Sequence, residues 1–326
     1  MPSRSSRPFE CMTAVAAALC ATTALGADFP AKSVRIVTPF PPGGSVDLVA
    51  RLLGNDLNKA WGQQVIVDNR SGASGNIGTE VAKNAPPDGY TLLLNTLPFV
   101  TNQFVYSRMP YDPITDFAPI SIVSSVAGLL VVHPSLPVRT VRDLVALAKT
   151  KPGAINYGTA GPATNPHISG ELLNYLGKIN LVAVHYKGGG AATTATISGE
   201  TQVFFSNTIP DVLPHVESNR LRALGVTSLQ RQPSAPQIPT LAESGLPGYE
   251  FTSWHVLAAP AATPRALILQ INEKVRTVLG TSEAVQRWRE RGVEIVASTP
   301  DEAAGYLKKE VQKWRGVFKE RGMKAE

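Results

Sequence analysis

The stretch VRIVTPFPPGGSVDLVARLLGNDL, residues 34–57, decides how the chain folds. It predicts a short apolar strand, a Pro-Pro-Gly-Gly turn, and an amphipathic helix that Ser45 or Asp47 caps. A strand that turns at glycines into a helix leaves backbone N–H groups unpaired at the positive end of the helix dipole. Such a turn holds anions, carboxylates included, without a dedicated cation. We therefore expect the functional site to lie against this turn.

Strand and helix patterns alternate along the rest of the chain. Apolar stretches predict strands over residues 34–38, 65–68, 91–95, 120–123, 128–133, 155–158, 181–186, 201–206, 221–226 and 251–258. Periodic stretches predict helices over residues 46–60, 75–84, 141–150, 166–176, 191–198, 264–279, 282–291 and 300–321, and Thr140 with Asp143 matches a capping box. The alternation predicts an α/β fold in which mostly parallel sheets are flanked by helices.

The length of the chain favours two domains, yet no Pro/Ser-rich linker divides it. We therefore predict a chain that crosses between two domains twice, through strand-like hinges near Val126 and Ser253. Residues 27–126 and 253–326 would form domain I, and residues 127–252 would form domain II.

Residues 1–26 have the pattern of a secretory signal peptide. Arg4 and Arg7 precede an apolar run, and Ala24-Leu25-Gly26 provides a small-x-small cleavage site. The run is shorter than the roughly 20 residues that a membrane-spanning helix needs. We expect a cleaved leader and an exported protein; a retained short anchor is the alternative.

The leader also contains both cysteines, Cys11 and Cys20, so the mature chain has no thiol for a disulfide, a nucleophile or a metal. The formal charge is +6, and removal of two arginines and one glutamate with the leader leaves +5. The positive residues are dispersed, which argues against a nucleic-acid partner.

The histidines give no sign of catalysis. They stand at positions 133, 167, 185, 215 and 255, without the spacing of a zinc site, and no G-x-S-x-G elbow accompanies them. We expect His167 to pack near a helix start. The sequence thus predicts no catalytic residue, no metal site and no cofactor.

Polar turns follow four of the predicted strands, over residues 41–47, 95–96, 158–165 and 206–208. In open α/β sheets, ligands bind beyond the carboxyl ends of the strands. The first two turns would then face the last two across a cleft lined by backbone N–H groups, hydroxyls and amides. This inventory suits a small polar anion, although the Pro-Pro-Gly-Gly segment could be a plain loop and Asp47 only a helix cap.

The mature chain resembles the Bug-type substrate-binding proteins of tripartite tricarboxylate transporters. The matching motifs are PFPPGGSVD (39–47), AR (50–51), VDNRSGA (67–73), GNIG (75–78), PDGYTL (87–92), KPG (151–153), NYG (156–158), His167, GEL (170–172), HYKG (185–188), LPH (213–215), ALGVT (223–227) and the segment 254–264. The resemblance implies a monomeric periplasmic receptor with a type II-like binding-protein fold. Such a receptor closes on a small organic carboxylate and delivers it to membrane permease subunits.

A receptor for a membrane sensor kinase, and an enzyme on the same fold, are the alternatives. The resemblance implies these ligand-binding residues: Phe40, Gly43, Gly44, Ser45, Asp47, Asn95, Thr96, Thr159, Ala160, Thr164, Asn165 and Asn207. The chain departs from the family pattern at Ser206 and Ala195, where relatives carry acids. The loss of an acid at Ser206 would disfavour an amino-acid ligand.

Overall fold

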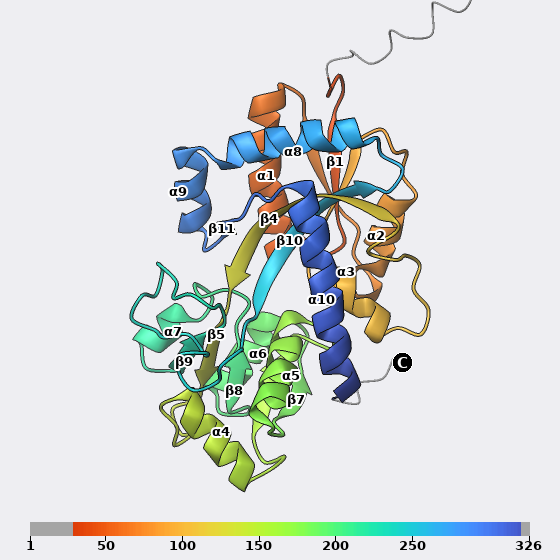
Figure 1. The fold of residues 1–326 in the computed structure, drawn as a ribbon. Helices are drawn as coiled ribbons and strands as arrows, with labels where there is room; N and C mark the ends of the chain where they lie inside the picture. The colour runs from red at the N-terminus through yellow and green to blue at the C-terminus, as the bar shows by residue number, and fades with distance from the viewer. Residues whose placement is uncertain (1–28, 321–326) are drawn as a thin grey trace, which may run out of the picture.

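The computed structural model describes residues 29–320, which form two β-sheets flanked by helices (Figure 1). The strands are β1 (Val34–Thr38), β2 (Val65–Asn69), β3 (Thr91–Asn95), β4 (Phe117–Ala127), β5 (Leu129–Val132), β6 (Asn156–Thr159), β7 (Val182–His185), β8 (Val203–Phe205), β9 (Arg222–Val226), β10 (Thr252–Pro260) and β11 (Glu294–Ile295). The helices are α1 (Ser45–Trp61), α2 (Asn76–Lys83), α3 (Pro98–Thr101), α4 (Val141–Thr150), α5 (Asn165–Gly177), α6 (Gly189–Ile197), α7 (Leu213–Glu217), α8 (Arg265–Leu279), α9 (Ser282–Glu290) and α10 (Pro300–Glu320), with 3-10 turns at Ala73–Gly75 and Asn102–Phe104. The predicted signal peptide, residues 1–26, lies outside the described residues.

The two-domain α/β fold is confirmed, but the sheets are mixed rather than mostly parallel. The first sheet has the order β11-β4-β10-β3-β1-β2, and the second has the order β7-β6-β8-β5-β9. β1 pairs in parallel with β2 and β3, and β6 pairs in parallel with β7 and β8. The remaining strand pairs are antiparallel. Among them, β4 carries the chain out of the first sheet and β10 carries it back alongside β4.

These two crossing strands join the domains (Figure 1). Thr252 at the start of β10 pairs with Ala127 at the end of β4, and β5 begins one residue after Gly128. The predicted boundaries at residues 126/127 and 252/253 fall within this paired segment; as domain limits they stay a prediction.

The predicted strands and helices are present, although their ends differ by a few residues. Three short elements, α3, α7 and β11, were not predicted from the sequence. α3 and α7 are too brief to show a 3.6-residue period, and β11 pairs with β4 through only two residues. The Thr140–Asp143 capping box is confirmed. The prediction that Ser45 or Asp47 caps α1 is wrong, because Gly44 is the N-cap residue and no side chain caps it.

α10 ties the crossing strand to both domains. Its buried Glu310 accepts hydrogen bonds from the indole N–H groups of Trp254 in β10 and Trp314 in α10, each at 2.9 Å. Near the end of α10, Glu320 Oε1 accepts a hydrogen bond from the Tyr175 hydroxyl of α5 at 3.4 Å. The helix therefore contacts the hinge and domain II as well as domain I.

Candidate functional site

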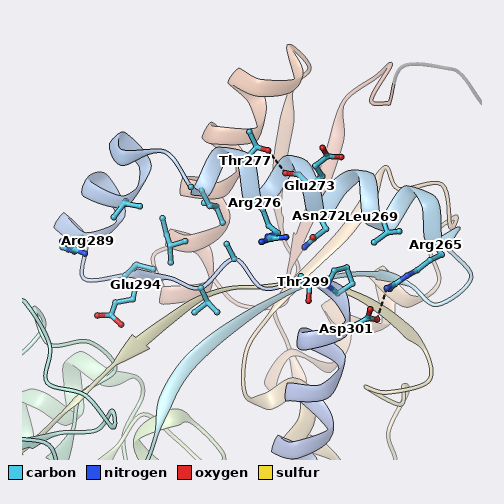
Figure 2. A pocket seen from close by; sticks show the side chains of 18 residues that line it. Arg265, Leu269, Asn272, Glu273, Arg276, Thr277, Arg289, Glu294, Thr299 and Asp301 are labelled. Carbon is cyan, nitrogen blue, oxygen red and sulfur yellow. Dashed lines mark hydrogen bonds and ion pairs between the residues drawn. The ribbon is translucent and has the colours of Figure 1, made fainter.

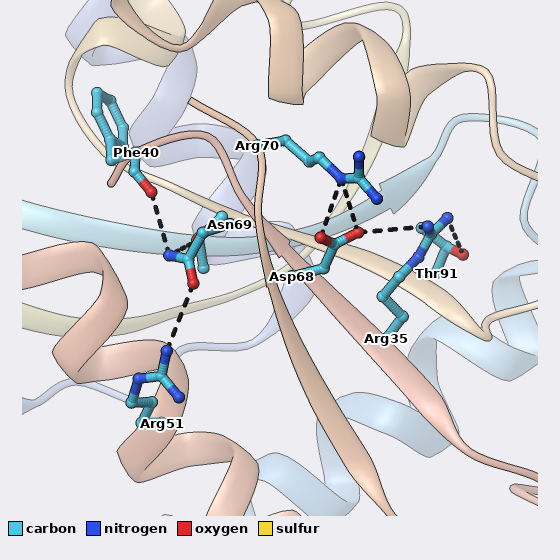
Figure 3. A network of polar contacts seen from close by, with 8 residues as sticks. Arg35, Phe40, Arg51, Asp68, Asn69, Arg70 and Thr91 are labelled. Atoms are coloured by element: carbon cyan, nitrogen blue, oxygen red, sulfur yellow. Dashed lines mark hydrogen bonds and ion pairs between the residues drawn. The ribbon is translucent and has the colours of Figure 1, made fainter. Parts of the chain in front are cut away.

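The turn between β1 and α1 is held from behind by a polar network. Asp47 Oδ2 accepts the N–H of Gly43 at 3.0 Å, and the Arg51 guanidinium pairs with the same carboxylate at 2.9 Å. The Asn69 amide, at the end of β2, donates to Asp47 Oδ1 at 3.0 Å. It also donates to the Phe40 carbonyl at 3.1 Å (Figure 3). The Pro-Pro-Gly-Gly segment is therefore a fixed part of the molecule rather than a plain loop.

Asp47 supports this turn and does not line the cleft. Its side chain is buried, and although burial alone would raise its pKa, the hydrogen bonds from Arg51, Gly43 and Asn69 lower the pKa below the usual carboxyl value. The carboxylate therefore stays ionised and bonded to the turn. Asp47 is thus placed behind the turn and not in the lining of the cavity described below, and a direct contact of Asp47 with the ligand stays a prediction.

We expect Asp47→Ala to lower the free energy of unfolding by about 2 kcal/mol, because the Gly43 N–H and the Asn69 amide lose their acceptor. Urea denaturation followed by circular dichroism measures this change. Asp301→Ala is the matched control: it removes an equally short ion pair, to Arg265 at 2.9 Å, whose Asp301 side chain is 85% exposed. That control should cost less than about 1 kcal/mol; equal effects of the two variants would contradict the role of Asp47.

The second turn follows β6 and opens α5. Gly161 N–H donates to Thr159 Oγ1 at 3.2 Å, and Thr164 Oγ1 donates back to the Gly161 carbonyl at 2.7 Å. Thr164 is the N-cap residue of α5, in extended conformation and without a side-chain cap bond. The first N–H groups of α5 thus have no capping side chain, as at the start of α1.

The two turns face one another across a cavity of about 290 Å³. The predicted site residues that line it are Phe40, Gly44, Ser45, Thr96, Ala160, Thr164, Asn165 and Asn207. The structure adds apolar walls that sequence reasoning missed: Pro41, Pro42, Val46, Pro98 and Pro166. Pro41 and Pro42 lie in the motif quoted above and could have been predicted as lining residues. No sequence motif marks Pro98.

Other predicted residues stand behind this lining. The Asn95 side chain accepts the Thr96 N–H at 2.8 Å and donates to Thr79 at 2.9 Å, so it orients Thr96. The Thr159 hydroxyl accepts the Gly161 N–H within the second turn. Both residues position the turns, and neither lines the cavity.

A second hollow of about 660 Å³ adjoins the cavity and shares Gly44, Ser45 and Asn207 with it. Gly43 lines this hollow, together with Gly189 and Gly190 at the start of α6. Farther walls include Asp211, His215 and Arg220. Partial burial raises the pKa of the Asp211 carboxyl, although much of this side chain still touches solvent.

Two lining residues of the cavity donate hydrogen bonds to the crossing strand β10, and the first of these bonds joins the two domains. Asn165 Nδ2, from domain II, donates to Ser253 Oγ on β10 at 2.8 Å. Thr96 Oγ1, from domain I, donates to the Trp254 carbonyl at 2.7 Å. Two side chains that line the cavity, Thr96 and Asn165, are thus bonded to the crossing strand.

Ser206 does not face this cavity. Its buried hydroxyl accepts the Leu129 N–H at 2.9 Å, beside the crossing from β4 to β5. The sequence argument that Ser206 disfavours an amino-acid ligand therefore loses its basis.

A larger hollow, of about 1080 Å³ (Figure 2), shares no lining residue with the cavity between the two turns. It runs between α8, α9, β11 and the start of α10, where Arg265 pairs with Asp301. All of its lining residues come from 265–301, and none is a predicted site residue. Because a single domain forms it, movement of one domain against the other would not enclose a ligand there.

Within residues 29–320, no three His, Cys, Asp or Glu side chains come together as a metal site requires. His255 is fully buried in β10, with Nδ1 3.1 Å from Ser124 Oγ. His167 lies behind the second turn, as the expectation of a packed residue indicated.

Comparison with known proteins identifies the family. The model described as "Tripartite tricarboxylate transporter family receptor" matches residues 49–323. The chain belongs to this family. The BugT protein of Bordetella pertussis is 33% identical over 298 residues, covering 91% of each chain. The motif-based resemblance is thereby confirmed for this tripartite tricarboxylate transporter receptor.

Solved structures agree with the fold of the receptor. The structure of Rpa4515 of R. palustris with adipate has a TM-score of 0.81 and 35% identity, and covers 91% of this chain and 100% of that one. MatC of Rhodopseudomonas palustris with bound malate has a TM-score of 0.76 and 27% identity, and covers 89% and 99%. The family is one of solute receptors, not of enzymes. Over residues 29–320, no helix is both long and apolar enough to cross a membrane.

Proposed function

We propose that the protein is a periplasmic receptor that binds a small organic carboxylate between its two domains. The observation that carries this proposal is the cavity of about 290 Å³ between two strand-to-helix turns, one from each domain. Gly44 and Thr164 open α1 and α5 without a side-chain cap bond. N–H groups at such helix starts bind carboxylates through hydrogen bonds and the helix dipole.

Different lining residues would bind different parts of the ligand. Backbone N–H groups of the two turns would hold the carboxylate, while Thr96, Thr164 and Asn165 would orient the rest of the ligand. The apolar walls suit a methylene chain, because its burial against proline and phenylalanine is favourable. The adjoining hollow gives room for the far end of a longer acid.

The names of two relatives support an organic acid as ligand, since Rpa4515 was solved with adipate and MatC with malate. Binding would shift the protein toward a closed state, because the ligand would contact lining residues of both domains, among them Asn165, which bonds to Ser253 on the crossing strand. We propose that the protein acts as a monomer, is exported by its leader, and delivers the ligand to the membrane permease subunits of a tripartite transporter.

A thermal-shift titration tests the proposal. We expect adipate or malate to stabilise the protein, by about 2.7 kcal/mol at a concentration of 100 times its Kd. The control ligand for adipate is 1,6-hexanediol, which keeps the six-carbon chain but has no carboxylate, and it should leave the melting temperature unchanged. Small-angle scattering should report a decrease in the radius of gyration on binding. Equal stabilisation by the diol, or no stabilisation by either acid, would count against a carboxylate receptor.

A further inference from the structure

The second turn contains a residue in a costly backbone conformation. Ala163 has φ +56°, in the left-handed region that residues with a Cβ seldom adopt. Its neighbours Thr164 and Asn165 line the ligand cavity, so the conformation at Ala163 sets where these side chains stand. Such a conformation persists only when the surrounding contacts hold it.

One contact that holds it is a hydrogen bond to a histidine ring. The Ala163 N–H donates to His167 Nδ1 at 3.0 Å, across the first turn of α5. A ring nitrogen accepts a hydrogen bond only when it carries no proton, so the neutral His167 ring has its proton on Nε2. Protonation of Nδ1 would set two donors against each other and break this bond.

Burial keeps the His167 ring neutral. The ring packs parallel to Tyr157, at 6.5 Å between centroids, and edge-to-face with His185, at 5.0 Å. Burial lowers the pKa of His167 to about 4, Glu171 on the same helix acts to raise it, and His185 acts to lower it further. Tyr157 donates its hydroxyl proton to Glu171 Oε1 at 2.8 Å.

His185 contacts the same turn but differs in one respect. Its Nδ1 lies 2.6 Å from Thr159 Oγ1, a hydroxyl that both donates and accepts. If His185 gains a proton, Nδ1–H can donate to that hydroxyl, whose own proton then points to the Gly161 carbonyl at 3.4 Å. An amide N–H has no such freedom, so only the His167 contact requires a neutral ring.

We propose that His167 is a positioning residue for ligand binding: its unprotonated Nδ1 holds the Ala163 N–H and thereby fixes the second turn of the ligand cavity. The expected effect of His167 on ligand affinity rests on the proposed function. Its expected effect on the conformation of the second turn does not. Acid would therefore loosen this turn before it unfolds the protein, and ligand affinity would fall with it.

The first experiment needs no ligand. ¹⁵N NMR of the full-length mature protein between pH 7 and pH 3.5 should show the Ala163 amide shift and the His167 ring titrating together, with a midpoint near 4. His167→Asn places an amide oxygen where Nδ1 stood, so the Ala163 bond should survive without any midpoint. His133→Asn is the matched control, because within residues 29–320 the His133 ring bonds to Ser135, beyond the end of β5 and away from the second turn. An Ala163 amide that does not follow the His167 titration would overturn the proposal.

The second experiment measures adipate affinity by calorimetry. We expect His167→Leu to bind about tenfold more weakly than wild type at pH 7, and His167→Asn to recover most of that loss. The ratio of wild-type to His167→Asn affinity cancels protonation of adipate itself, and it should fall about twofold on going from pH 7 to pH 4. A constant ratio would contradict the positioning role. If wild type does not bind adipate, adipate is rejected as a ligand of the proposed receptor. The NMR titration of the Ala163 amide then tests the role of His167 by itself.

Discussion

Replacement of Gly128 by alanine should lower the free energy of unfolding by more than about 3 kcal/mol, as expected when a group is forced into a space that is already filled. Gly128 connects β4 to β5, where the chain enters domain II. A Cβ at this position would stand 2.1 Å from the carbonyl oxygen of Ser206. The obstacle is backbone, so no side-chain rotation relieves it.

The surrounding bonds make a shift of the backbone costly. Gly128 N–H donates to Thr227 Oγ1 at 2.9 Å, and the Gly128 carbonyl accepts the Thr227 N–H at 3.1 Å. Ser206 N–H donates to the Leu129 carbonyl at 3.0 Å. Any movement that makes room for a methyl group therefore breaks bonds between three segments of domain II.

Urea denaturation of Gly128→Ala against wild type measures the loss. Gly305→Ala in α10 is the matched control, because a Cβ there meets no atom within 4 Å. Alanine in the interior of a helix should stabilise the protein by about 0.5–1 kcal/mol. A Gly128→Ala protein as stable as wild type would show that the crossing tolerates displacement.

The sequence pattern predicted which segments form strands and helices, but it did not predict the direction of the strands. Periodicity reports whether one face of a segment is buried, and it is the same for parallel and antiparallel pairs. β4 and β10 have the apolar composition of central strands. Their antiparallel pairing follows from the path of the chain between two domains. Local sequence patterns do not predict that path.

The candidate site shows the same limit at the level of single side chains. Thr96, Thr164 and Asn165 were expected in the cleft, and they line the cavity. Asp47 and Asn95 are also polar and stand in the predicted turns 41–47 and 95–96, yet their side chains accept N–H groups of those turns. The backbone torsions of each turn decide which way a side chain points, and these depend on contacts such as Asn69 to Asp47 that lie far apart in the sequence. Residue type and spacing therefore identified the turns but did not separate ligand contacts from supports.

His255 should make the stability of the protein depend on pH below neutrality. The side chain is fully buried in β10, its Nδ1 lies 3.1 Å from Ser124 Oγ, and its Nε2 has no hydrogen-bond partner in the described part of the chain. Burial lowers the pKa of His255 to about 3, whereas an exposed histidine in the unfolded chain has a pKa near 6.5. Between these values the unfolded state binds a proton that the folded state does not, so the stability is complete above pH 6.5 and decreases as the pH falls toward 3.

Each pH unit inside this window should remove about 1.4 kcal/mol of unfolding free energy through His255 alone. His255→Asn keeps a polar atom opposite Ser124 but cannot take up a proton, so the difference in stability between wild type and variant should shrink by about 3 kcal/mol from pH 7 to pH 4. Urea denaturation at both pH values measures that difference. The variant should retain a smaller slope, because burial also lowers the pKa of His167, to about 4. Parallel pH profiles for wild type and variant would contradict this prediction, because they would mean that the fully buried His255 ring takes up a proton in the folded protein without cost.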